Sequence, residues 1–284
     1  MLEVGISGSF ENAAYSYSAL RQIFNAIEEM VENVVIKFSK DVVRAQVIDS
    51  MHVCLCDIEL KTSLFSHYRC DRDVIVTLNL KIFNTILKNC SVSSSDSSFM
   101  ISCKEMVQTQ RSSQKENETA EEGKKEILCS ATKLLVTNEV NSSTQKFTVD
   151  LLESENPQFM MPEADWKSQI DLHKDGFRLL KNLGNLFGTK VTFKVREDEF
   201  TLCQSGDGTK SDLVLKGDDE TKPYQITCEE PCSIEINKTY LDLVSKLFGL
   251  SDSLKICLSN DAPIFFELSL NKNGFVHFFI APQA

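Results

Sequence analysis

The chain carries the same order of helix and strand patterns twice. Apolar residues recur at helical spacing in four segments that begin near residues 18, 80, 174 and 237. The first and third segments, and likewise the second and fourth, are separated by about 156 of the 284 residues. Runs rich in Val, Ile, Phe and Thr with alternating polarity lie between them, which predicts strands. A period of half the chain predicts two copies of one α+β domain with antiparallel sheets and few helices.

The predicted elements can be placed along the chain. The helices are expected over residues 18–32, 80–88, 174–187 and 238–248, and the strands include 34–38, 53–60, 99–103, 190–195, 254–259 and 264–270. Residues 150–165 hold two prolines, five acids and the apolar Phe159, Met160 and Met161, which predicts an extended connector fixed to a surface. We therefore expect an N-terminal domain at 1–148, a connector at 149–166 and a C-terminal domain at 167–284. The polar segment 108–125 predicts a disordered loop that interrupts a strand region.

The composition predicts a soluble protein that keeps its thiols reduced. Hydrophobic residues make up 42% and charged residues 25% of the chain, and no apolar run is long enough to span a membrane. The N-terminus lacks the basic start and apolar stretch of a signal peptide, so we expect the ten cysteines to be free, in cytosol or nucleus. A net charge of −11 argues against coating nucleic acid with the whole surface, but it allows a local basic face.

Catalytic and metal-binding patterns are weak, so we predict no catalytic residue, no metal and no cofactor. His52, Cys54 and Cys56 alternate, which allows a zinc site, but no CxxC pair occurs and buried strand cysteines are the better interpretation. The glycines of residues 206–210 lack P-loop spacing and predict a hairpin turn. A hydrolase or zinc enzyme around His52 stays a minor alternative, because only four histidines are present.

Basic side chains line one face of each predicted helix. Lys174, Arg178 and Lys181 follow i, i+4 and i+7 spacing and share a stripe. The other helices contribute Arg21, Lys81, Lys88, Lys238 and Lys246. One such face alone is ordinarily solvated. Four of them in a repeated fold predict contacts to the DNA backbone, and the absence of aromatic residues between them disfavours single-strand binding.

Several motifs resemble the proliferating cell nuclear antigen family of eukaryotic sliding clamps. They are Asp49-Ser50-Met51-His52-Val53, the stretch Tyr68-Arg69-Cys70-Asp71-Arg72, the connector end Met161-Pro162-Glu163, and Phe278-Phe279-Ile280-Ala281-Pro282. The resemblance covers nearly the whole chain, apart from an enlarged loop around residues 104–126. Outside these motifs the similarity is weak, which indicates a divergent member.

The resemblance implies a closed ring of three chains around double-stranded DNA, without sequence preference and with helices lining the hole. It implies a homotrimeric processivity factor in the nucleus that docks replicative DNA polymerase, clamp loader, flap endonuclease, DNA ligase and translesion and repair enzymes. Edge strands near 132–138 and 199–204 would form the subunit contacts by analogy. The alternative is a subunit of a heterotrimeric checkpoint clamp or of a repair-specialised clamp. The acidic Glu28, Glu29 and Glu32, where the family usually presents a lysine, keep this alternative open.

The family's partners insert a short motif, a glutamine followed by a 3₁₀ turn with one aliphatic and two aromatic side chains. Carried over residue by residue, the pocket for this motif would be Ile48, Val53, Leu55, Phe159, Met161, Pro263, Phe279 and Pro282. His52 and Ala281 would contact the glutamine. Core packing is the competing interpretation for Val53 and Leu55, whereas residues of a connector and a terminus fit it less well. Many members also carry an acidic tail after the final proline, which is absent from this sequence.

Overall fold

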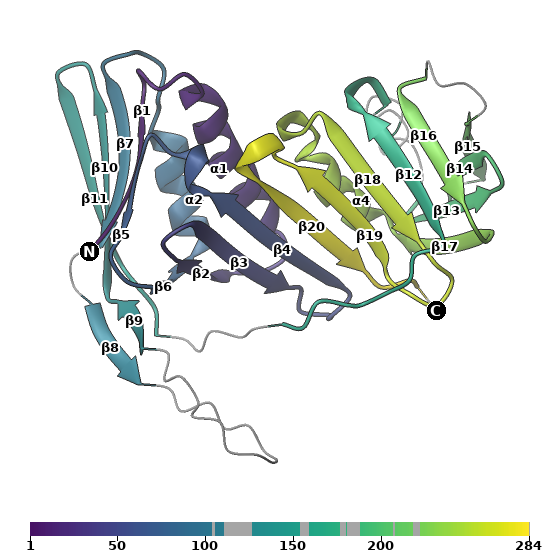
Figure 1. Cartoon of the computed structure of the whole chain (residues 1–284), viewed down its shortest axis with the longest axis horizontal. Coiled ribbons are helices and arrows are strands. Elements are labelled where there is room, and N and C mark those ends of the chain that lie inside the picture. The colour runs from purple at the N-terminus through teal and green to yellow at the C-terminus, as the bar shows by residue number, and fades with distance from the viewer. Residues whose placement is uncertain are drawn as a thin grey trace. The chain divides into compact units, whose positions relative to one another are not determined.

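The computed structural model describes residues 1–103, 106–110, 127–153, 159–176, 180, 188–206, 208–217 and 222–283. These residues form two compact units (Figure 1). Unit 1 comprises Met1–Arg21, Glu32–Ala45 and Leu60–Pro157, and unit 2 comprises Gln22–Val31, Gln46–Glu59 and Gln158–Ala284.

Unit 1 is built mainly of antiparallel strands. Its elements are β1 (Leu2–Ser7), α1 (Ala13–Ile27, whose end belongs to unit 2), β2 (Asn33–Phe38), β3 (Val42–Ile48, likewise shared), a 3₁₀ turn (Thr62–Leu64), β5 (His67–Cys70), β6 (Val74–Asn79), α2 (Leu80–Asn89), β7 (Ser97–Cys103), β8 (Met106–Gln110), β9 (Ile127–Ala131), β10 (Lys133–Val140) and β11 (Ser143–Asp150). The strand orders are β11-β10-β7-β1-β5 and β3-β2-β6-β9-β8. The one parallel pair between described strands is β6 with β9.

Unit 2 has the same kinds of element. They are β4 (Cys54–Lys61, mostly in this unit), β12 (Ser168–His173), β13 (Lys190–Arg196), β14 (Glu199–Gly206), β15 (Thr209–Lys216), β16 (Tyr224–Cys228), β17 (Cys232–Asn237), α4 (Lys238–Ser245), a 3₁₀ turn (Phe248–Leu250), β18 (Ser253–Leu258), β19 (Ile264–Ser269), a second 3₁₀ turn (Asn271–Asn273) and β20 (Gly274–Ile280). The strand orders are β16-β12-β18-β19-β20-β4 and β15-β14-β13-β17.

The strand orders confirm the predicted repeat. The order β11-β10-β7-β1-β5 matches β20-β19-β18-β12-β16 strand for strand, and β6-β2-β3 matches β17-β13-β14. Asn33 begins β2 and Lys190 begins β13, an offset of 157 residues; α2 and α4 begin at Leu80 and Lys238, an offset of 158. The chain therefore has a duplicated α+β fold. The domain boundaries at 148 and 167 stay a prediction.

The helices begin where side chains or carbonyls satisfy their first amides. Asn79 caps α2 by accepting a hydrogen bond from the Ile82 amide at 3.1 Å, and Asn237 caps α4 by accepting one from the Thr239 amide at 2.9 Å. Both starts confirm the sequence prediction. The first helix differs, since it begins at Ala13 rather than near 18 and ends at Ile27 rather than near 32.

The early end of α1 has a local cause. The Glu29 and Met30 amides donate to the carbonyls three residues back, at 3.2 and 3.0 Å, so the chain tightens into a turn after Ile27. Glu28, Glu29 and Glu32 therefore follow the helix instead of lying on it. Of the third predicted helix, residues 174–176 and 180 are helical, and the remainder lies outside the described residues.

The predicted polar loop begins later than expected. Residues 108–110 complete β8, which pairs antiparallel with β9 in the register Gln108↔Cys129 and Gln110↔Ile127. Residues 111–126 lie outside the described part of the chain. The predicted hairpin after Gly206 is confirmed, because β14 and β15 pair down to Gly206↔Thr209 and Gly208 has a φ of 76°.

The predicted strand cysteines and the absence of a membrane span are consistent with the core. Cys54 and Cys56 are fully buried in β4. The nine cysteines with described side chains are all free thiols. No three metal-ligating side chains cluster among the described residues, and the described helices include none long and apolar enough to cross a membrane.

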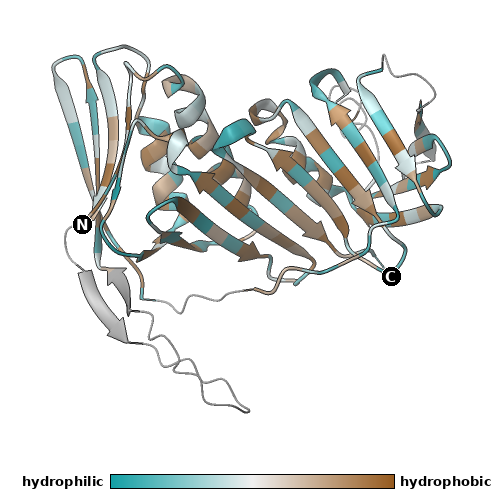
Figure 2. Cartoon of the chain, in the orientation of Figure 1, coloured by the Kyte–Doolittle hydropathy of each residue, from teal (hydrophilic) through white to brown (hydrophobic). Residues whose placement is uncertain are grey.

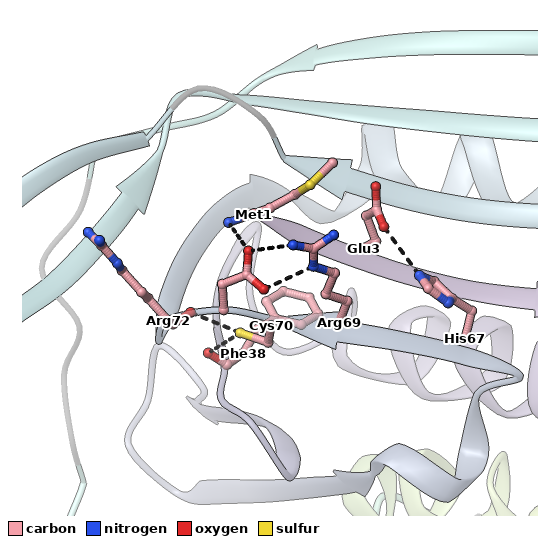
Figure 3. A network of polar contacts seen from close by, with 8 residues as sticks. Met1, Glu3, Phe38, His67, Arg69, Cys70 and Arg72 are labelled. Carbon is pink, nitrogen blue, oxygen red and sulfur yellow. Dashed lines mark hydrogen bonds and ion pairs between the residues drawn. The ribbon is translucent and has the colours of Figure 1, made fainter.

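The Tyr68–Arg72 motif fixes edge strand β5 by a polar network (Figure 3). The Arg69 guanidinium donates twice to the Asp71 carboxylate, at 2.9 and 3.2 Å, and this hydrogen bonding holds the pKa of Asp71 below its ordinary value. The Cys70 thiol donates to the carbonyl of Arg72 at 2.9 Å, and the Tyr68 hydroxyl donates to the carbonyl of Ser39 at 2.5 Å. These contacts give the motif a structural role.

Alternation along β20 separates a buried face from a half-exposed one. Val276, Phe278 and Ile280 are fully buried, whereas Phe275 and His277 on the other face are half-buried. Figure 2 shows the resulting concentration of apolar residues along β4, β19 and β20. The last strand of the chain is thus part of the core of unit 2.

Phe278→Ala should lower the free energy of unfolding by about 3–5 kcal/mol, because it opens a cavity in a fully buried site. Phe275→Ala in the same strand should cost about 1 kcal/mol, since its side chain is only half-buried. Urea unfolding at one fixed protein concentration measures both values. Equal losses in the two variants would contradict the assignment of the two faces.

Candidate partner pocket and DNA-facing surface

An apolar cluster lies on one face of the unit 2 sheet and includes five of the predicted pocket residues. Leu55, Cys257, Phe265 and Phe279 are buried in it, and Ile48, Phe159, Met161 and Trp166 pack against them, partly exposed. We call these eight residues the connector cluster. Burial raises the pKa of the Cys257 thiol to about 12, so this thiol is neutral and acts as an apolar group.

Strand register brings the rings of the connector cluster together. Phe265 lies opposite Phe279 in the β19–β20 pair and opposite Cys257 in the β18–β19 pair, so all three side chains share one face. The ring centroids of Phe265 and Phe279 are 4.9 Å apart, and Trp166 stacks on Phe265 at 5.0 Å. This arrangement provides a largely aromatic floor with Trp166 on one side.

Two hydrogen bonds hold the connector over this floor. The Phe159 amide donates to the Gln46 side-chain oxygen at 3.1 Å, and the Trp166 indole donates to the Pro263 carbonyl at 3.1 Å. Phe159 and Met161 pack inward, whereas Met160 between them is 93% exposed. The connector therefore contributes two apolar side chains to the cluster and presents a third to solvent.

The other predicted pocket residues do not belong to the connector cluster. His52 is exposed and adopts a φ of 58°, and Pro282 is also exposed. Val53 is half-buried and accepts a hydrogen bond from the Ala281 amide at 2.8 Å. Pro263 participates through its carbonyl. Trp166, Phe265 and Cys257 were missed from sequence, although the alternating pattern of residues 264–270 could have placed Phe265 on this face.

The turn before β4 is fixed by the buried Asp49 carboxylate. One oxygen accepts from the amides of Val53 and Cys54, at 2.8 and 2.7 Å, and the other accepts from the Tyr240 hydroxyl at 2.9 Å. Burial alone would raise the pKa of Asp49, but these hydrogen bonds outweigh it and lower the pKa below its ordinary value. The carboxylate is therefore ionised and structural.

A cavity of about 180 Å³ adjoins this turn. It is lined by Glu29, Met30, Asp49, Ser50, Met51, Asn237, Thr239, Tyr240 and Leu243. No histidine, lysine or cysteine is among these lining residues, so they supply no base beside the Ser50 hydroxyl apart from carboxylates that already have partners. The lining thus lacks a nucleophile–base pair of the usual kind.

His277 extends the aromatic row of β20. It stacks on Phe275 at a centroid distance of 3.9 Å and meets the edge of Phe265 at 5.0 Å. Burial, assisted by Lys255, lowers its pKa to about 4, although Glu59 opposes this and the Glu267 carboxylate lies 3.6 Å from its Nε2. His277 is therefore neutral at pH 7.

The predicted DNA-facing residues differ in their partners. Arg21, Lys81 and Lys88 are exposed and form no ion pair among the described residues. Three others are paired: Lys174 with Asp252 at 3.3 Å, Lys238 with Asp242 at 3.2 Å, and Lys246 with Glu29. Arg178 and Lys181 lie outside the described residues.

The two strands predicted as sheet edges are interior strands. Residues 132–138 fall mainly in β10, which lies between β11 and β7, and residues 199–204 fall in β14, which lies between β15 and β13. The open edges are instead β11 and β15. Both have mostly exposed side chains, including Val214 at 45%, which explains why neither was recognised as a strand from apolar alternation.

These observations define a class: a non-transmembrane α+β chain with two copies of a DNA-clamp fold. Residues 9–125 match the family model described as "Proliferating cell nuclear antigen, N-terminal domain", and residues 160–283 match the corresponding C-terminal domain. The chain belongs to the proliferating cell nuclear antigen family. Membership supports a sliding-clamp role in DNA replication and repair, and the clamps of this family are non-catalytic.

Curated relatives match over nearly their whole length. The proliferating cell nuclear antigen of Chaetomium thermophilum is 23% identical over 270 residues, which cover 94% of this chain and 95% of that protein. That of Caenorhabditis elegans is 23% identical over 278 residues, which cover 96% and 97%. The low identity agrees with a divergent member.

Asp49→Asn should destabilise the protein by about 2 kcal/mol at pH 7, because it removes charge-assisted hydrogen bonds from a buried turn. The folded-state pKa lies below 3.8, so this contribution is present above that pH and is lost as the pH falls toward the folded-state value. Urea unfolding at pH 7 and at progressively lower pH should therefore show the gap from wild type closing in acid. Tyr240→Phe, which removes one hydrogen bond, should cost about half as much. A gap that does not change with pH would contradict this account.

Proposed function

We propose that the chain is a sliding clamp that closes into a homotrimeric ring around duplex DNA in the nucleus. The ring would raise the processivity of a replicative DNA polymerase. It would also dock the clamp loader, flap endonuclease, DNA ligase, and translesion and repair enzymes. The domain boundaries at residues 148 and 167 and the connector between them are part of this proposal.

One observation carries the ring. In the second repeat the strand order ends at β20, and β20 is hydrogen-bonded to β4, a strand of the first repeat. The equivalent of β20 in the first repeat is β11, and β15 follows β14 in the second repeat as β4 follows β3 in the first. Both β11 and β15 are open edges. Pairing of β11 with β15 of the next copy would repeat the β20–β4 arrangement between chains.

Such pairing is head to tail. A heterologous contact that repeats by rotation closes into a ring, and closure removes every open edge of this kind. The alternative, a subunit of a heterotrimeric checkpoint clamp or a repair-specialised clamp, is favoured by the acidic residues after α1, where the family presents a lysine. A single chain that carries both complementary edges favours the homotrimer.

The connector cluster is proposed as the pocket for the partner motif. Its buried floor of Phe265 and Phe279 and its partly exposed wall of Phe159, Met161 and Trp166 suit aromatic and aliphatic anchors. His52, Val53, Pro263, Ala281 and Pro282 would complete the pocket around the glutamine. The Ala281–Val53 hydrogen bond keeps the chain end beside this turn.

Val214→Glu should convert the ring into smaller species, because it places a charge on the exposed face of an edge strand. Multi-angle light scattering of the wild-type protein should give three times the 32.0 kDa of one chain. The variant should move toward one chain. Ser233→Glu, an exposed change on β17 in the same sheet, serves as the control. A wild-type monomer at micromolar concentration would exclude the homotrimer and favour the heteromeric alternative.

A peptide that bears a glutamine followed by one aliphatic and two aromatic residues should bind the wild-type protein. Phe159→Ala and Met161→Ala should each weaken binding at least tenfold, since both remove an inward-packed wall of the pocket. Met160→Ala should have a much smaller effect, because that side chain points to solvent between them. Isothermal titration calorimetry measures all three affinities. Equal affinities in the three variants would refute the placement of the pocket.

A further inference from the structure

The basic side chains of the proposed DNA-facing surface fall into two electrostatic groups. In unit 1, Arg21, Lys81 and Lys88 are exposed and have no ion pair or side-chain hydrogen bond among the described residues. In unit 2, each described lysine of the surface has a carboxylate within ion-pair distance. From this difference, and resting on the proposed function, we propose that the duplex is gripped mainly by the three unit 1 cations. The paired unit 2 lysines contribute little.

The physical argument is one of competition. A phosphate that approaches a paired lysine meets the carboxylate as well, so the lysine must either leave its partner or keep a repelling charge beside the phosphate. Exposed ion pairs are individually weak, but they cancel most of the field beyond their immediate surroundings. An unpaired cation suffers neither loss. The unit 1 residues are therefore the stronger phosphate sites of the described set.

The Lys246–Glu29 pair shows why the acidic residues after α1 matter. Glu29 belongs to the turn that follows Ile27, and Lys246 caps the end of α4, so the pair joins two segments far apart in the sequence. A carboxylate at this place removes the charge that a basic residue would otherwise offer to DNA. Glu29 thus acts as a built-in competitor for phosphate.

The first test compares two matched triple variants. One carries Arg21→Gln, Lys81→Gln and Lys88→Gln, and the other carries Lys174→Gln, Lys238→Gln and Lys246→Gln. Binding to a 30-base-pair linear duplex with open ends is followed by fluorescence anisotropy over a series of salt concentrations. Each lost phosphate contact lowers the slope of log affinity against log salt by about 0.9. We expect the first triple to lower this slope by about 2.7 and the second by less than 1.

The second test removes the competitor. Glu29→Gln should raise affinity and increase the salt slope by about 0.9, because Lys246 becomes available to phosphate. Glu11→Gln removes an equal charge from an exposed residue without an ion pair among the described residues, and it should leave the slope at its wild-type value. Arg178→Gln with Lys181→Gln measures the share of the two basic residues outside the described set. Circular dichroism and light scattering confirm that each variant keeps its fold and mass.

The outcomes separate this inference from the proposed function. Equal slope losses in the two triples, or an unchanged slope in Glu29→Gln, would overturn the unequal grip while leaving encirclement intact. A duplex blocked at both ends by bulky proteins should not bind a closed ring, since the ring cannot thread onto it. Equal binding of blocked and open duplexes would contradict encirclement itself.

Discussion

The hydrogen-bonded pairing of β20 with β4 is the interaction on which the rest of the structure depends. Backbone amides and carbonyls at a sheet edge need partners, and here the last strand of the second repeat finds them on a strand of the first. The same junction seats the connector cluster, because Leu55 comes from β4 and Phe279 from β20. The equivalent strands β11 and β15 have no such partner within their sheets. One rule of edge pairing thus accounts for the proposed pocket and for the proposed ring.

Much of the fold could be predicted from the sequence because its signals are local. Helical periodicity and the asparagine caps placed α2 and α4, and the common offset revealed the duplication. The start of α1 was missed because its first turn, from Ala13, carries few apolar residues at helical spacing. Edge strands were misplaced for a different reason: alternation identifies a strand, but whether it has one neighbour or two depends on distant pairing. The polar residues of β11 concealed a strand that ordinary alternation would have revealed.

The candidate site was predicted in part, for reasons that its residues make clear. Ile48, Leu55, Phe159, Met161 and Phe279 followed from a family motif, and the structure gathers them in one cluster. Trp166 and Phe265 were missed because their contribution depends on cross-strand register and on the hydrogen bond from Trp166 to the Pro263 carbonyl. Similarly, the pairing of Lys246 with Glu29 joins distant segments, so a reading of helix faces alone counted as available a cation that already has a partner.

The central claim is that β11 of one copy pairs with β15 of the next. Site-specific photo-crosslinking tests it most directly, with benzoylphenylalanine introduced in place of the exposed Gln145 of β11. After irradiation, mass spectrometry should find the probe joined to residues 209–216 of another copy, in covalent species of no more than three chains. Crosslinks from β11 to β11, or none between copies at micromolar concentration, would contradict head-to-tail closure.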